Sequence, residues 1–196
     1  MSVAESKVKQ VLENPLEYDG WTIQGLGMLR LHLDGQRDTR LHIWDTQTAL
    51  NDQLSAHDHP WDIVSSMIYF GSMGNQRYAI GDDGDIPIQI SRVLCGIGSD
   101  FEGGTTAGMM TELGSREEYG PGEKYSLEAT EFHNSFPSRG AVTVIERRER
   151  PDLELAGDRK MATICWSGEQ DWYREGFNRV ATVDEILHFT GLVALS

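Results

Sequence analysis

Residues 55–71, SAHDHPWDIVSSMIYFG, place two histidines one residue apart, directly before a run rich in β-branched and aromatic residues. On an extended chain, residues i and i+2 project to the same face, so we expect His57 and His59 to present both imidazoles together. Imidazole is a common protein ligand of iron, zinc, copper and nickel. The pair therefore indicates either a metal site at the start of a strand or a polar loop that leads into one.

The segments around this stretch alternate apolar and polar residues and are separated by turn signals. In residues 28–45, MLRLHLDGQRDTRLHIWD, the alternation on both sides of Asp34-Gly35 predicts two antiparallel strands joined by a turn. The glycine-rich residues 96–122 instead predict a long loop or a distorted hairpin, either a lid over a site or a disordered insert. The alternation predicts further strands at residues 63–70, 77–80, 86–94, 124–127, 141–146 and 161–166.

Helices are expected only near the two ends, over residues 2–13 and about 182–190, and each of these segments opens with a capping box. Many short strands between two short helices predict an all-β fold, a barrel or sandwich of the jelly-roll type. The length suits a single domain over residues 1–196, with the barrel core at about 28–166.

The charge of the chain restricts its partners. The formal net charge is −14, and the one basic run, ERRER at 146–150, alternates sign and predicts a solvated strand edge. We therefore expect a small-molecule partner, no nucleic acid and no membrane, and leave a homodimer open. The sequence has no apolar stretch of about 18 residues, and its two distant cysteines, Cys95 and Cys165, fit free thiols in a cytoplasmic protein.

A third histidine, His133, follows a Pro-Gly turn and a short strand in residues 121–137, PGEKYSLEATEFHNSFP. Together with the histidine pair and with Gly71, which ends the strand after it, this order resembles the two motifs of the cupin superfamily. The resemblance covers about residues 28–148. It implies a cupin-type jelly-roll β-barrel whose mouth holds a metal ion through His57, His59 and His133.

Two departures from the cupin pattern refine this expectation. Ile63 and Val64 stand where many cupins carry a glutamate, so the chain resembles the three-histidine branch, the thiol dioxygenases, which bind Fe(II). Thr130 replaces the turn glycine that is usual before the last histidine. The resemblance implies Fe(II) as the first choice of cofactor, with Zn, Ni, Mn or Cu as alternatives, and O2 as a second substrate.

The activity expected from this resemblance is that of a mononuclear Fe(II) dioxygenase that oxidises a small polar molecule, such as a thiol or an amino-acid-like compound. A metal-assisted isomerase or lyase and a non-catalytic small-molecule-binding protein are the alternatives. The sequence does not separate these three functions, because all of them would use the same barrel.

Several residues near the histidines are candidates for further roles. Trp61 is expected to form a wall of the site, and Asp62 either orients a ligand imidazole or stabilises a local turn. Glu131 lies two residues before His133, so on an extended chain the two share a face, and Glu131 is a fourth ligand, a general base or a surface acid. His32 and His188 are assigned to surface or core roles.

Arg40 and His42 share one face of a predicted strand. If this face points into the barrel, Arg40 binds a substrate carboxylate and His42 lies beside the metal as a catalytic candidate. The apolar Leu41 and Ile43 compete for the interior, which favours the outward orientation of Arg40 and His42. The remaining candidates for lining the pocket are Tyr69, Tyr125 and Arg92.

Overall fold

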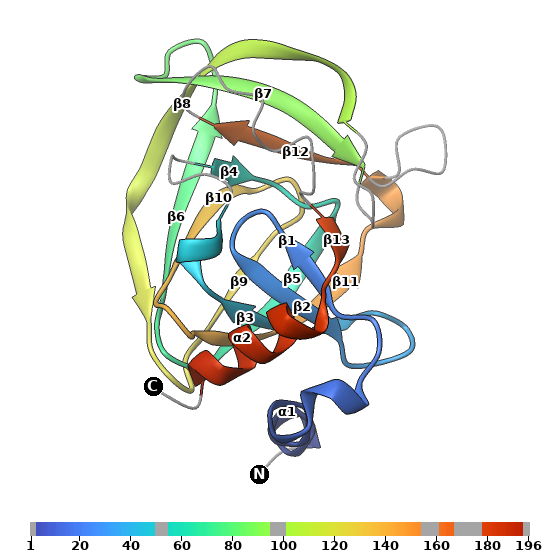
Figure 1. The fold of residues 1–196 in the computed structure, drawn as a ribbon. Helices are drawn as coiled ribbons and strands as arrows, with labels where there is room; N and C mark the ends of the chain where they lie inside the picture. Colours follow the sequence, from blue (N-terminus) through green and yellow to red (C-terminus); the bar gives the residue numbers. More distant parts are fainter. Residues whose placement is uncertain (1–2, 50–54, 95–100, 154–160, 167–177, 194–196) are drawn as a thin grey trace.

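Most of the described chain is β-strand, arranged in two antiparallel sheets with one short helix toward each end (Figure 1). The computed structural model describes residues 3–49, 55–94, 101–153, 161–166 and 178–193. The mainly β architecture with terminal helices is confirmed. Short 3-10 turns lie at Pro15–Glu17, Thr46–Thr48 and Pro151–Leu153.

The first sheet has seven strands in the order β13-β1-β2-β3-β11-β5-β9. At its centre, the predicted hairpin around Asp34 is present, with Leu29 opposite Ile43 and Leu31 opposite Leu41. The Asp34 carboxylate accepts hydrogen bonds from the amides of residues 38 and 39 and so closes the turn. The bounds are β13 (Asn178–Val180), β1 (Thr22–Gln24), β2 (Met28–His32), β3 (Thr39–Trp44), β11 (Val142–Glu149), β5 (Trp61–Phe70) and β9 (Lys124–Leu127).

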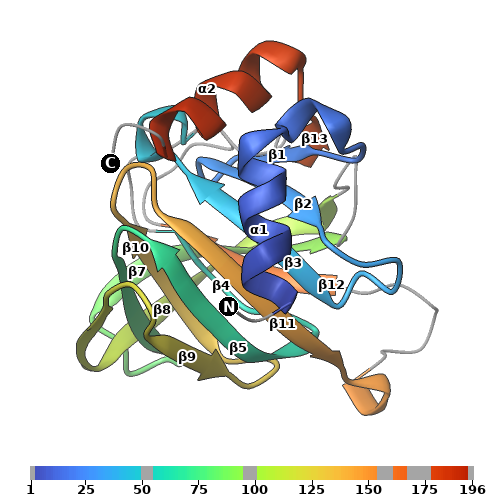
Figure 2. The same cartoon turned by 90° about the horizontal axis from the view of Figure 1, so that it is seen from below.

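Helices α1 (Val3–Glu13) and α2 (Val183–Val193) pack on the outer face of this sheet (Figure 2). Their apolar side chains form one buried cluster with the leucines and isoleucines of β2 and β3. The capping box of α2 is formed, since the Thr182 amide donates to the Glu185 carboxylate and the Glu185 amide to the Thr182 hydroxyl. No helix in the described ranges is long and apolar enough to cross a membrane.

The second sheet has the strand order β10-β4-β12-β7-β8-β6, and its end strands β10 and β6 also pair with each other. The short strand β4 pairs with β10 on one side and with β12 on the other. The bounds are β10 (Phe132–Pro137), β4 (Ser55–His57), β12 (Met161–Trp166), β7 (Ile86–Leu94), β8 (Phe101–Tyr119) and β6 (Met73–Ile80).

Of the two alternatives for residues 96–122, the long loop is wrong for most of the segment, and the distorted hairpin fits the irregular antiparallel pairing of β7 with β8. Residues 95–100 lie outside the described part, but Phe101–Tyr119 forms the long strand β8, which pairs with both β7 and β6. Two glycines of this strand have structural roles. Gly114 adopts a φ of +69°, and Gly108 allows close packing, since a Cβ there would lie 2.5 Å from Ile90 Cδ1. The glycines therefore mark close packing and a bulge in a strand, and the proposed lid has no support.

Candidate metal centre and its cavity

The structure brings His57, His59 and His133 together. One nitrogen of each imidazole lies within 4.8 Å of the corresponding nitrogens of the other two. The ring centroids are 5.0 Å apart for His57 and His59, 4.5 Å for His57 and His133, and 5.0 Å for His59 and His133. Two segments separated by more than seventy residues of sequence therefore supply one compact nitrogen cluster.

Backbone pairing between these two segments fixes the cluster. His57, the last residue of β4, lies directly opposite His133 of β10. The carbonyl of His59 accepts a 2.9 Å hydrogen bond from the Thr130 amide, so the turn before β10 is tied to the histidine pair. Thr130 has a φ of +67°, the left-handed conformation for which glycine is suited.

The imidazoles are in an environment that favours their neutral form. Burial lowers the pKa of both His59 and His133 well below the ordinary value, and the neighbouring imidazoles lower it further. His133 Nδ1 lies 3.4 Å from the carbonyl oxygen of Glu131, which can only accept, so Nδ1 carries the hydrogen. His133 Nε2 is therefore left with its lone pair available for an ion.

The donor set fits a transition metal. Three neutral nitrogens suit Fe, Zn, Cu or Ni better than Mg or Ca, which prefer oxygen. Asp58, between the two ligand candidates, accepts a 2.5 Å hydrogen bond from the Thr163 amide, and burial raises its pKa to about 6. Within the described residues, the cluster that could hold an ion contains the three histidines and no carboxylate.

A cavity of about 440 Å³ opens beside the three histidines, between the two sheets. Arg40 and His42 both line it, and they are only 9% and 5% exposed, so the outward orientation favoured by their sequence is wrong. Both faces of β3 are buried: Leu41 and Ile43 pack toward the helices, while the opposite face forms the cavity wall. Alternation therefore distinguished the two faces of β3 correctly, but neither face meets solvent.

Two predicted aromatic residues also line the cavity. The Trp61 ring stacks on His59, with centroids 5.5 Å apart. Tyr125 lies near Ser66, Ser135 and Asn75, and burial raises the pKa of its hydroxyl. By contrast, Tyr69 packs against the helix-side core, and Arg92 is exposed outside the cavity lining.

The carboxylates proposed to assist the histidines lie elsewhere. Glu131 belongs to a turn, with its amide bonded to the Glu128 carbonyl, so the expected extended chain is absent and its side chain pairs with Arg77 at 2.7 Å. Glu131 therefore contacts the candidate metal ligand His133 with its backbone carbonyl, while its carboxylate pairs with Arg77. Asp62 accepts hydrogen bonds from the Ala129 amide and from Arg148 and Arg150, so it stabilises the turn before β10.

The sequence interpretation missed the basic side of the cavity. Arg147 belongs to the run expected to be solvated, but its side chain is 9% exposed and lines the cavity. In a run whose charges alternate in sign, nothing in the local sequence distinguishes a buried arginine from a solvated one. The other basic residues that line this side are Arg30, His32 and Arg37.

Two residues that carried expectations lie away from the cavity. His188 contacts the buried Asp45 at 2.8 Å. Cys165 is a buried free thiol whose pKa is raised to about 12, and Cys95 lies outside the described residues.

Three imidazoles from two separated segments, placed beside a cavity in a mainly β fold, are compatible with the resemblance found in the sequence. In comparisons with known proteins, the chain matches no family model and no curated sequence.

Proposed function

We propose that this chain is a metal-dependent enzyme with a cupin-type jelly roll, in which His57, His59 and His133 hold one Fe(II) ion. The proposed reaction is the oxidation of a small polar molecule, such as a thiol or an amino-acid-like compound, by O2. The supporting observation is the cluster of three imidazole nitrogens within 4.8 Å of one another at the wall of a 440 Å³ cavity.

The residues of this chain have distinct tasks in the proposal. The three histidines supply neutral donors and leave the remaining coordination positions to ligands from the cavity. An Fe(II) ion bound there would supply the capacity to bind and activate O2. The Trp61 ring, stacked on His59, holds that imidazole in place and excludes water from one side of it.

One observation favours a second candidate, a metal-assisted isomerase or lyase. Both ring nitrogens of His42 are buried and have no hydrogen-bond partner among the described residues, and the ring lines the same cavity. A neutral imidazole so placed is able to accept a proton from a bound substrate. In this candidate a bound ion polarises a carbonyl group and His42 moves the proton.

Metal analysis tests the site. We expect protein purified without chelator to contain about one transition-metal ion per chain, and His57→Ala, His59→Ala and His133→Ala each to lose most of it, because each removes one of three ligands. His188→Gln is the matched control, since His188 lies at Asp45, away from the cavity, and metal content should be unchanged. A single ligand variant that stays folded and fully loaded would remove that residue from the site.

Oxygen consumption separates the two reactions. Iron with O2 uptake in the presence of a thiol or an amino acid supports the dioxygenase. Zinc or nickel without O2 uptake supports the isomerase or lyase, and metal-free protein that does not take up any of these ions contradicts both.

A further inference from the structure

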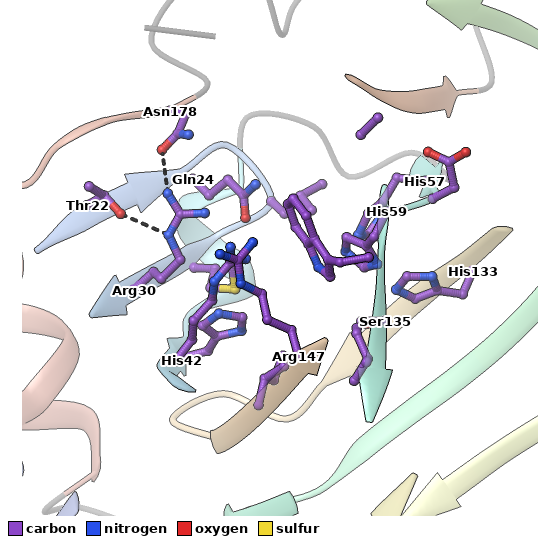
Figure 3. A pocket seen from close by; sticks show the side chains of 18 of the residues that line it. Thr22, Gln24, Arg30, His42, His57, His59, His133, Ser135, Arg147 and Asn178 are labelled. Atoms are coloured by element: carbon purple, nitrogen blue, oxygen red, sulfur yellow. Dashed lines mark hydrogen bonds between the residues drawn. The ribbon is translucent and has the colours of Figure 1, made fainter. Parts of the chain in front are cut away.

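The cavity has a histidine side and a basic side. The three imidazoles lie on one side of the pocket, and Arg30, His42 and Arg147 lie on the other (Figure 3). The wall next to the imidazoles is the part of the protein that a bound molecule would contact closest to its reacting group. The chemistry of this wall therefore indicates which kind of molecule fits there.

An apolar patch lies beside His57 on the face of the second sheet that lines the cavity. Ile164 of β12 is directly opposite His57 of β4, and Ala162 is directly opposite Val93 of β7. Opposite residues of antiparallel strands share a face, with their Cβ atoms about 5 Å apart, and residues i and i+2 of one strand share a face as well. The apolar patch therefore consists of Val93, Ala162 and Ile164, and all three line the cavity.

The apolar patch is buried but is not part of the apolar core. Val93, Ala162 and Ile164 are 7%, 9% and 1% exposed, yet none of them belongs to the three apolar clusters that the described residues form. Buried apolar side chains ordinarily pack together in such clusters. The polar groups that border the patch already have partners, since the Asp58 carboxylate accepts from the Thr163 amide. The patch therefore offers apolar surface to whatever occupies the cavity.

The first sheet contributes an apolar residue that is already engaged by protein groups. Trp61 lines the cavity and belongs to one of the core clusters. Its ring stacks on His59, and the guanidinium groups of Arg40 and Arg147 each lie 4.7 Å from the ring centroid. The patch on the second sheet is therefore the better candidate for contact with an apolar group.

The cavity is large compared with a free amino acid. Its volume is about 440 Å³, whereas an apolar cavity of roughly 150 Å³ already holds one benzene molecule. It therefore has room for an aromatic ring or a branched alkyl group in addition to a polar group at the histidines. A wholly polar molecule of the size of cysteine would leave the apolar patch in contact with water, which is unfavourable.

We propose that Val93, Ala162 and Ile164 bind an aromatic or branched aliphatic group of the ligand, next to the group that lies at the histidines. The assignment of this ligand to the substrate rests on the proposed function. Within the proposed class of thiols and amino-acid-like compounds, the substrate is then one that carries an apolar group close to its reacting atom, because Ile164 is directly opposite His57.

Binding of two neutral thiols to metal-free protein tests the proposal. We expect calorimetry under nitrogen to show that benzyl mercaptan binds about tenfold or more tightly than 2-mercaptoethanol, since each buried methylene contributes about fourfold in affinity. Equal affinity for the two thiols would overturn the proposal.

Variants locate the binding. Val93→Thr keeps the shape of the side chain but places a hydroxyl in the patch, and Ala162→Val fills part of the space beside it. Each should weaken benzyl mercaptan about fivefold and leave 2-mercaptoethanol unchanged. Val144→Thr is the matched control, since Val144 is also buried but belongs to the cluster that packs against the helices, and binding should stay the same.

Melting temperatures show which variants are folded. If Val93→Thr does not fold, Ala162→Val decides, because it adds only two carbons to a strand residue. A folded patch variant that binds benzyl mercaptan as the unchanged protein does would place the apolar group elsewhere and contradict the proposal. Since no metal is added, failure of the metal site would leave this result unaffected, and failure of the patch would leave metal content and O2 uptake as tests of the proposed function.

Discussion

Thr130 combines a β-branched side chain with a left-handed backbone, and replacing it by glycine should stabilise the protein. Its φ is +67°, and its amide donates to the carbonyl of His59, so the turn holds this conformation in place. A residue with a Cβ pays about 1–2 kcal/mol for the left-handed region, and β-branching makes the position unusual.

The expected gain is smaller than this strain. Glycine is more flexible in the unfolded chain, which costs about 0.5–1 kcal/mol. The Thr130 side chain is exposed, so its removal sacrifices little buried surface. We therefore expect Thr130→Gly to raise the free energy of unfolding by about 0.5–1 kcal/mol, which corresponds to a melting temperature about 1–4 °C higher.

Thermal unfolding of metal-free protein, followed by circular dichroism, measures this effect. Thr130→Ala is the matched control because it removes the same hydroxyl and methyl groups but keeps the Cβ, so it should give no such gain. A melting temperature for Thr130→Gly equal to or below that of Thr130→Ala would refute the assignment of strain to this residue.

Two further changes address the turns that surround the site. Asp62→Asn should lower the free energy of unfolding by about 1–2 kcal/mol at neutral pH, because the carboxylate accepts from Ala129 and from two arginines that hold its pKa at about 2. Since this folded pKa is below the unfolded value, the stabilisation is complete above about pH 4 and lost as pH falls toward 2, so urea titrations of the two proteins should converge there. Gly71→Ala should destabilise by about 2 kcal/mol or more in the same assay, because φ is +71° and a Cβ would lie 2.5 Å from Ser138 Oγ. Gly81→Ala, which has open space at its Cβ, should change stability little, and equal effects of the two glycine variants would contradict the packing argument.

Local patterns predicted the parts of the fold that depend on neighbours in sequence. The Asp34 hairpin and the two helices follow from alternation, turn chemistry and capping, and all three are present. The convergence of His57, His59 and His133 was expected because the order of turns and strands resembles a known arrangement, and the structure brings them together.

The errors concern features that depend on distant partners. The glycines of residues 96–122 suggested a long loop or a distorted hairpin, but the strands on both sides of Phe101–Tyr119 supply hydrogen bonds that no local pattern reveals. Arg40 looked solvated because Leu41 and Ile43 seemed to account for the interior, and Arg147 because it belongs to a run of alternating charge, although both line the cavity. Glu131 was placed beside His133 on the assumption of extended chain, which the turn before β10 prevents.

Among the described residues, one residue pair joins β4 to β10, His57 opposite His133, and this has a consequence for motion. Both members of this pair are proposed ligands, so an ion would link β4 to β10, the two strands of this sheet that share the fewest described residue pairs. Without the ion, β4 should separate transiently from β10, and amide hydrogens along β4 should exchange with deuterated water faster than those of β5. Metal loading would then slow exchange selectively at β4 and at the start of β10. The ion would in this way set how long β4 and β10 stay paired.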